Sequence, residues 1–217
     1  MPRTARPVAS GIPLHIVHRG HNRVACFRAP DEYSAYLALL GKAASLSQCR
    51  VHAYVLMTNH VHLLVTPSDA GSAAALMKTV AQRFAQASNA RYKRTGALWE
   101  GRFYSGLVLR DSQFLACHRY IELNPVRAGM VGHPAAYEWS SYRINAEGQQ
   151  SSLVEPHETY LRLAHDPAER LTAYRELFST ELSPADLEAI RRGPRGPRGR
   201  PKKGTVPISE KGTVPFI

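Results

Sequence analysis

Two short β-rich runs separated by a tight turn constrain the fold of this 217-residue chain more than any other feature. They cover residues 51–57 and 61–66, and together they predict a β-hairpin. The same preference for β-branched and aromatic residues predicts two further strands, one before and one after the hairpin, at residues 14–18 and 102–109. A chain with these four strands is expected to fold around a sheet.

Stretches of helical periodicity lie between the strands. One begins at Pro30, and another covers residues 72–94. A third helix is predicted to begin at Asp111 or Ser112 and to stop before Pro125. The order β-α-β-β-α-β followed by a helix predicts an α+β, ferredoxin-like fold, in which helices cover one face of an antiparallel sheet. Because this fold hosts many functions, function has to be inferred from particular residues.

The pattern changes beyond about residue 146. We expect one compact domain over residues 9–145, a helical extension over residues 146–190 and a basic, disordered tail over residues 191–217. Short helices are predicted within the extension at residues 157–163 and 168–178. A third begins at Ser183-Pro184, which has the pattern of an N-cap followed by proline at the first helical position.

The positive charge of the chain is concentrated in that tail. The formal net charge is +11, and the tail contributes +7 through eight Lys or Arg residues and one Glu. Such a balance favours polyanionic partners such as nucleic acid. No apolar run reaches the roughly 20 residues of a membrane span, and the three cysteines show no metal-ligand or disulfide spacing. We therefore expect a cytoplasmic protein without a membrane partner.

A histidine pair stands out within the hairpin. His60 and His62 flank Val61, and because side chains alternate along a strand, both imidazoles leave the same face of the sheet. They could bind one divalent cation. An isolated pair of this kind is more often one exposed and one half-buried histidine, but two polar rings in an apolar hairpin need a reason. A third ligand would have to come from elsewhere.

The third predicted helix supplies further candidates. Tyr120 and Asn124 are four residues apart, which would place them on one face of its last turn. A phenol beside a cation is deprotonated more easily and can attack phosphorus. The carbonyl oxygen of Asn124 could complete the metal shell. By spacing alone, a tyrosine packed in the core is the more common case.

Two longer motifs resemble those of a known superfamily. Residues 54–64 (YVLMTNHVHLL) resemble the metal motif of the HUH endonucleases, and residues 120–129 (YIELNPVRAG) resemble the tyrosine helix of the single-tyrosine transposases. Three other segments extend a narrower resemblance to the REP-associated tyrosine transposases over about residues 12–142: RGHNR at 19–23, LWEGRF at 98–103 and WSSY at 139–142.

The resemblance implies that residues 9–145 form an HUH catalytic domain that cleaves and rejoins single-stranded DNA, with hairpin-forming repeats as expected substrates. It implies that Tyr120 is the nucleophile and forms a 5′-phosphotyrosine intermediate. It further implies that His60 and His62 hold the metal, Mg²⁺ or Mn²⁺. The family's third ligand lies four residues after the tyrosine, where a related class has Gln and this chain has Asn124.

Basic residues around the predicted sheet are candidates for phosphate contacts: Arg19, Arg23 and Arg102. Each could equally be a solvated charge at a strand end. In the tail, residues 197–201 (PRGRP) resemble an AT-hook core, in which Arg198 and Arg200 would enter a narrow minor groove. A generic basic tail that binds any nucleic acid is an equal alternative.

Three other functions are compatible with parts of the pattern. The chain could be a domesticated, sequence-specific DNA-binding regulator of repeat elements with little catalysis. It could be a replication or conjugation nicking enzyme of the same superfamily, although those often carry two tyrosines or a helicase domain. A metal-dependent hydrolase that uses water would need carboxylate ligands, for which Asp69 and Glu122 are candidates. A covalent protein–DNA adduct separates the tyrosine enzyme from the binder and the hydrolase.

Overall fold

The computed structural model describes residues 9–192, and a four-stranded sheet forms its centre. The strands are β1 (Leu14–Arg19), β2 (Cys49–Met57), β3 (His60–Pro67) and β4 (Tyr104–Leu107). They lie in the order β2-β3-β1-β4, and each neighbouring pair is antiparallel. β2 and β3 form the predicted hairpin. This order confirms the α+β, ferredoxin-like fold expected from the sequence.

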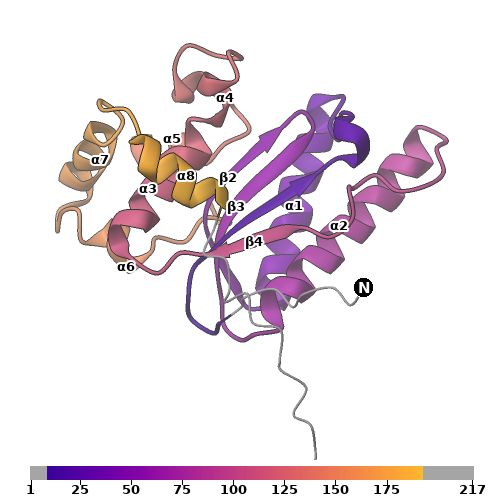
Figure 1. Cartoon of the computed structure of the whole chain (residues 1–217), viewed down its shortest axis with the longest axis horizontal. Helices are drawn as coiled ribbons and strands as arrows, with labels where there is room; N and C mark the ends of the chain where they lie inside the picture. The colour runs from indigo at the N-terminus through magenta and orange to yellow at the C-terminus, as the bar shows by residue number, and fades with distance from the viewer. Residues whose placement is uncertain (1–8, 193–217) are drawn as a thin grey trace, which may run out of the picture.

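Helices cover both faces of the sheet (Figure 1). On one face lie α1 (Pro30–Leu46) and α2 (Ser72–Arg91), the two helices of the split unit. They pack on alternate residues of β1 and β3, all fully buried: Leu14, Ile16, Val61, Leu63 and Val65. On the other face lies α3 (Asp111–Glu122), packed in a second core cluster that includes Val55, Leu64 and Ile121.

The chain after α3 forms short helices on the same side of the sheet as α3 (Figure 1). They are α4 (Asn124–Arg127), α5 (Tyr142–Glu147), α6 (Glu158–Leu161), α7 (Pro167–Glu176) and α8 (Pro184–Arg192). Two 3₁₀ turns, η1 (His21–Arg23) and η2 (Pro134–Ala136), complete the order of elements within residues 9–192. Tyrosines of α5, α6 and α7 form a third core cluster. None of the described helices is long and apolar enough to cross a membrane.

The outer edge of β2 is covered by a segment that follows α4. The backbone N–H of Leu56 donates to the carbonyl of Trp139 (2.9 Å), and the N–H of Ser141 donates to the carbonyl of Tyr54 (3.0 Å). An open edge would present unpaired backbone groups to other chains. The segments after α3 therefore complete the sheet as well as flanking it.

Two predicted boundaries need correction. The fourth strand is shorter than residues 102–109, so Arg102 lies in the loop that precedes it. α3 ends at Glu122, and Asn124 begins α4 instead of continuing the last turn of α3. The physical reason is Pro125, which occupies an early position of the new helix, where its missing N–H costs no hydrogen bond.

The extension contains the helices expected near residues 157–163 and 168–178, as α6 and α7. α8 begins as predicted, since the hydroxyl of Ser183 accepts a hydrogen bond from the N–H of Asp186 (3.1 Å) and Pro184 is the first helical residue. Residues 191 and 192 end α8. The rest of the predicted tail lies outside the described residues.

Candidate functional site

Strand alternation brings three histidines to the α3 face of the sheet. His62 pairs with Val17 and His60 with Arg19, while His15 lies two residues before Val17 on β1. The ring centroids of His60 and His62 are 5.0 Å apart. Those of His15 and His62 are 5.1 Å apart, and their planes are nearly parallel. The predicted pair is therefore part of a row of three imidazoles.

One ring nitrogen of each predicted ligand is engaged. Nδ1 of His60 lies 2.7 Å from Oδ1 of Asn59. The amide nitrogen of Asn59 donates to the carbonyl of Arg23 (3.0 Å), so its oxygen accepts the His60 proton. Nδ1 of His62 lies 2.9 Å from Nε2 of His15. Neither His60 nor His62 uses Nε2 in a hydrogen bond within residues 9–192, which leaves that atom of each ring for a metal.

Burial keeps these rings neutral. It lowers the pKa of His60 to about 4, with the charge of Arg19 as a smaller cause. It lowers the pKa of His62 well below its ordinary value, and it lowers the pKa of His15 to about 4. A neutral imidazole is the form that binds a metal. At neutral pH these rings could therefore bind a cation without first losing a proton.

Tyr120 projects from α3 onto this row. Its ring centroid lies 5.7 Å from that of His62 and 5.7 Å from that of His15, edge to face in both cases. The residue is only 9% exposed. It lines a pocket of about 490 Å³ together with His62, Arg19 and Arg102. The fold thus brings the candidate nucleophile, which lies on α3, and a candidate metal ligand, which lies on the sheet, into one pocket.

Asn124 adjoins Tyr120 at the start of α4. Its amide nitrogen donates to the carbonyl of Tyr120 (2.9 Å) and also to that of Ile121 (3.3 Å), so the amide oxygen is the atom left for a cation. Among residues 9–192, no group of three or more His, Cys, Asp or Glu side chains could hold a metal ion. A third ligand would therefore be of another type, and an amide carbonyl oxygen is one that Mg²⁺ and Mn²⁺ accept.

Arg127 on α4 is a site residue that the sequence analysis missed. Its guanidinium carbon lies 4.1 Å from the centroid of the Tyr120 ring, and Nη2 donates to the Tyr120 carbonyl (2.7 Å). Its charge also reaches His62, whose pKa it lowers further after the larger effects of burial and the neighbouring histidines. The turn between α3 and α4 folds this arginine back over the tyrosine.

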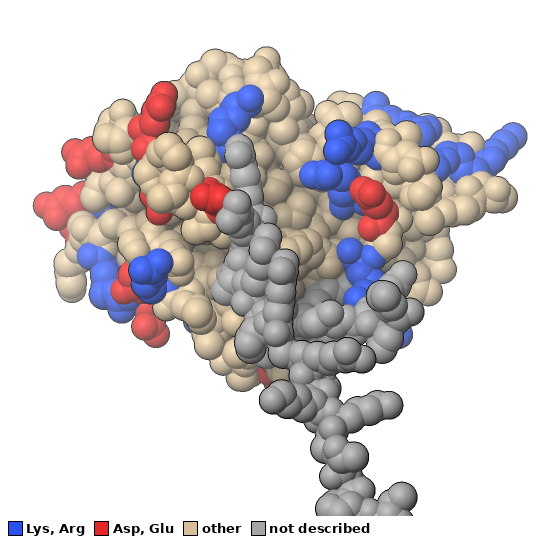
Figure 2. All heavy atoms as spheres, viewed as in Figure 1, with Lys and Arg blue, Asp and Glu red and all other residues tan. Residues whose placement is uncertain are grey.

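Three of the five arginines predicted to bind DNA, those around the sheet, lie around the mouth of the site. Arg19 and Arg102 line the pocket of Tyr120, and Arg19 and Arg23 line a neighbouring hollow with His60. All three arginines are exposed. Figure 2 shows Lys and Arg side chains predominating over the sheet and α2 on this face, while acidic side chains gather over α7. Exposed arginines beside a recessed site suit phosphate contacts.

The turn after β1 is docked against the tip of the hairpin. A Cβ on Gly20 would lie 2.5 Å from the carbonyl oxygen of Val24 and 2.7 Å from Sγ of Cys26, so this position requires glycine. The N–H of Gly20 donates to the carbonyl of Asn59 (2.8 Å). The backbone beside His60 is therefore held by the turn that carries the arginines.

The two carboxylates considered for a hydrolase lie elsewhere. Oδ1 of Asp69 accepts the N–H groups of Gly71 and Ser72 at the start of α2. Asp69 follows the opposite end of β3 from His60, and the strand between them spans roughly 23 Å. Glu122 is fully buried and accepts hydrogen bonds from three side chains, those of Ser141, Asn145 and Tyr174. Neither carboxylate is placed to bind a metal at the histidine pair.

Comparison with protein families assigns the chain. A family model described as "Transposase IS200 like" matches residues 8–124, more than half of the sequence. The chain belongs to the IS200-like transposases. As a member of this family, the transposase has a function in DNA processing. A search of curated protein sequences gave no match for it.

Solved structures align with the transposase to different extents. The structure of a REP-associated tyrosine transposase bound to a REP hairpin aligns with a TM-score of 0.59 and 17% identity, over 72% of this chain and 93% of that one. A crystal structure of a proposed transposase from Deinococcus radiodurans R1 aligns with a TM-score of 0.40 and 20% identity, over 56% of this chain and 96% of that one. The first likeness supports the fold assigned to the transposase.

Most of the site residues predicted for this transposase meet in space. His62, Tyr120, Arg19 and Arg102 line one pocket, and His60, Arg19 and Arg23 line the neighbouring hollow. Asn124 contacts the backbone of Tyr120. Arg198 and Arg200 lie outside the described residues. His15, Asn59 and Arg127 also contact these residues and were not predicted from the sequence. The sequence could have indicated Asn59, because it is adjacent to His60, and Arg127, because it lies seven residues after Tyr120. His15 could be found only from the pairing of β1 with β3.

Proposed function

We propose that this transposase is a metal-dependent tyrosine enzyme that cleaves and rejoins single-stranded DNA, with hairpin-forming repeats as its substrate. The observation that carries the proposal is the position of Tyr120, whose ring lies 5.7 Å from that of His62. Both residues line a pocket whose rim includes Arg19 and Arg102. A nucleophile, a candidate metal ligand and phosphate-binding groups are the parts that such a reaction needs.

In the proposed reaction, the phenol oxygen of Tyr120 attacks the scissile phosphorus and its proton passes to solvent. The bond between phosphorus and O3′ breaks, and O3′ takes up a proton and leaves as a free 3′-hydroxyl. The 5′-phosphate stays on Tyr120 as a phosphotyrosine ester. Attack of a 3′-hydroxyl on this ester reverses the steps, so rejoining needs no other source of energy.

The residues present fit a divalent cation. Nε2 of His60 and Nε2 of His62 would hold it, together with Oδ1 of Asn124. Mg²⁺ or Mn²⁺ bound there would supply positive charge that polarises the phosphate. Because Mg²⁺ prefers oxygen ligands, a site with two imidazoles favours Mn²⁺. Arg19 and Arg102 would orient the phosphates on either side of the reacting one.

A single strand suits this site better than a duplex. Tyr120 is 9% exposed and lies in a recess between the sheet and α3, with Ile190 of α8 among the lining residues. An unpaired strand can bend a phosphate into such a recess, whereas base pairing holds the backbone on the outside of a wide helix. The REP-associated transposase of similar fold was solved with a REP hairpin, which makes hairpins the first substrates to test.

The decisive experiment is a search for a covalent adduct. Labelled strands from the repeats that flank the gene are incubated with the protein and Mn²⁺, and denaturing electrophoresis separates covalent complexes from bound ones. We expect an adduct with the wild type and none with Tyr120→Phe, which should still bind DNA. An adduct with Tyr120→Phe would refute the assignment. Tight binding without any adduct in the wild type would favour a DNA-binding regulator of repeat elements.

A further inference from the structure

A buried histidine without a role in the proposed chemistry lies behind His62. His15 is 4% exposed, and its ring lies nearly parallel to that of His62, with 5.1 Å between centroids and 12° between planes. Its Nε2 lies 2.9 Å from Nδ1 of His62. The same ring meets Tyr120 edge to face at 5.7 Å. His15 therefore touches both a candidate metal ligand and the candidate nucleophile.

The hydrogen bond between the two rings has two possible directions. If His15 donates, His62 accepts at Nδ1 and carries its own proton on Nε2, which then has no lone pair for a metal. If His62 donates, its proton lies on Nδ1 and the lone pair on Nε2 is available. The second direction requires a neutral His15 whose proton is on Nδ1.

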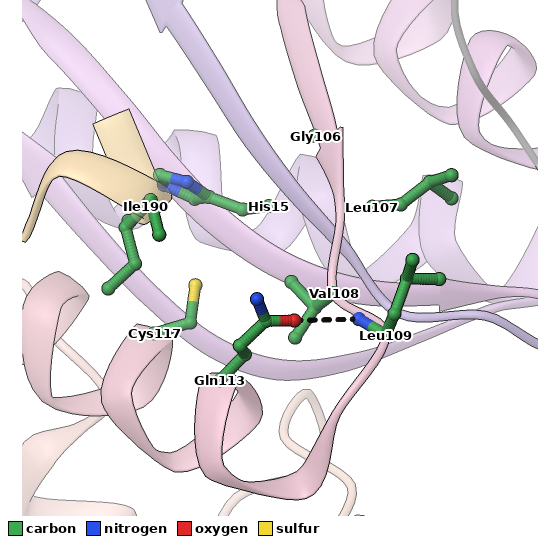
Figure 3. Close-up of a pocket in the computed structure, with 9 residues that line it drawn as sticks. His15, Gly106, Leu107, Val108, Leu109, Gln113, Cys117 and Ile190 are labelled. Atoms are coloured by element: carbon green, nitrogen blue, oxygen red, sulfur yellow. Dashed lines mark hydrogen bonds between the residues drawn. The ribbon is translucent and has the colours of Figure 1, made fainter. Parts of the chain in front are cut away.

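The proposed function requires the second direction, because only then does Nε2 of His62 keep its lone pair for a metal. Figure 3 shows the His15 ring extending from β1 toward Ile190 of α8, beside a cavity of about 190 Å³ that Cys117 of α3 also lines. Nδ1 of His15 is buried and makes no hydrogen bond within residues 9–192.

We propose that His15 is a positioning residue that holds His62 in the tautomer with its proton on Nδ1, so that Nε2 can bind the cation. This inference rests on the proposed function, because it takes His62 as a metal ligand. Asn59 has the same role for His60, whose Nδ1 proton it accepts at 2.7 Å. Water could replace Asn59 at its partly exposed position, whereas the buried side of His62 depends on His15.

Two substitutions at residue 15 separate this role from packing. His15→Gln keeps an acceptor close to the position of Nε2, whereas His15→Phe keeps a planar ring and has no acceptor. His18→Phe is the matched control, because His18 is also 4% exposed, lies on the same strand and stacks on Trp99 at the opposite face.

Mn²⁺ binding by the full chain, measured by titration calorimetry, is the first readout. We expect His15→Phe to weaken binding by about 10- to 100-fold, as removal of a ligand's outer partner does. His15→Gln and His18→Phe should stay within about threefold of the wild type, since both leave an acceptor for His62. Equal Mn²⁺ affinity of the Phe and Gln variants at residue 15 overturns the proposal.

The tautomer itself is measured in the metal-free wild type by ¹⁵N NMR of the histidine rings, which requires no variant to fold. We expect the proton of His62 on Nδ1, and a proton on Nε2 overturns the proposal. Neither readout involves DNA. A wild type that forms no covalent DNA adduct would therefore refute the proposed function, while the calorimetry and NMR still decide the role of His15.

Discussion

The guanidinium carbon of Arg127 lies 4.1 Å from the centroid of the Tyr120 ring, and the same side chain donates to the Tyr120 carbonyl at 2.7 Å. The two interactions fix the cation on one face of the ring. A cation in this position holds the ring in a single orientation and stabilises negative charge that develops on the phenol. Since Arg127 is exposed, water screens part of this effect.

We expect Arg127→Met to slow formation of the covalent adduct by about threefold to thirtyfold, the span of cation–aromatic interactions from exposed to desolvated sites. Affinity for the single strand should change little, and Arg127→Lys should recover part of the rate. Single-turnover cleavage and equilibrium binding of one labelled strand measure the two quantities. A decrease in affinity as large as the decrease in rate would show that Arg127 binds phosphate instead.

Metal removal should stop the chemistry and spare binding. We expect EDTA to abolish adduct formation by the wild type and added Mn²⁺ to restore it. His60→Ala should raise the Mn²⁺ concentration needed for half-maximal rate by about tenfold or more, because the metal then has one ligand fewer. His165→Ala, which changes an exposed histidine of the extension, serves as the control. Full cleavage in EDTA would mean that the histidine pair is structural.

Glu122 should make folding depend on pH. Burial raises its pKa from 4.5 to about 7, although hydrogen bonds from Ser141, Asn145 and Tyr174 oppose the shift. The folded state therefore holds this proton more tightly than the unfolded state does. Stability should fall as pH rises from about 4.5 to about 7 and then level off, by a total of the order of 3 kcal/mol.

Glu122→Gln imitates the protonated carboxyl and should remove this slope. The variant should match the wild type near pH 4.5 and exceed its stability at pH 8. Urea denaturation at both pH values gives the two free energies of unfolding. Glu147→Gln, an exposed change on α5, should keep the slope. If the wild type is as stable at pH 8 as at pH 4.5, Glu122 does not make folding depend on pH in this way.

Deletion of residues 193–217 should weaken DNA binding while the chemistry survives. The deletion leaves α8 intact and removes six Lys or Arg residues and one Glu. The slope of the logarithm of the binding constant against the logarithm of the salt concentration should decrease in magnitude. The decrease should be roughly 0.7 to 0.9 for every phosphate that the tail neutralises in the full chain. Cleavage of a short single strand should proceed at the wild-type rate, and an inactive deletion variant would contradict this account of the tail.

The AT-hook hypothesis for the tail makes a sharper prediction. If residues 197–201 enter a minor groove, the full chain should prefer AT-rich to GC-rich duplex beside the cleavage site. Changing both Arg198 and Arg200 to Ala should abolish that preference. Scrambling the tail at constant composition distinguishes the two alternatives, because a generic basic tail would bind equally well after scrambling.

The parts of the fold that could be predicted are those set by local patterns. Strand alternation placed His60 and His62 on one face, and helical periodicity located α1, α2 and α3. The prediction that Asn124 lies on the last turn of the same helix as Tyr120 was wrong for a local reason as well. A spacing of four residues places two side chains on one helix face only if the helix continues between them. Pro125 instead takes an early position of a new helix, and the side chain of Asn124 turns back onto α3.

Other features depend on interactions between distant segments and left no local signal. His15 and His62 are 47 residues apart, and they meet because of the β1–β3 register. Glu122 resembled a possible metal ligand in the sequence. Its surroundings come from α7, from α5 and from the residue before α5, and together they bury the carboxylate.

The helix that carries Tyr120 lies over the hairpin of its own chain, reached from β4 by a short connection through Arg110. In genetic terms, the inactive variants Tyr120→Phe and His60→Ala should then fail to complement each other. Neither chain has a complete site, so mixing them restores no activity. With Tyr120 as nucleophile, one molecule also carries one DNA end at a time. Moving a segment with two ends would therefore take two molecules or two successive rounds by one.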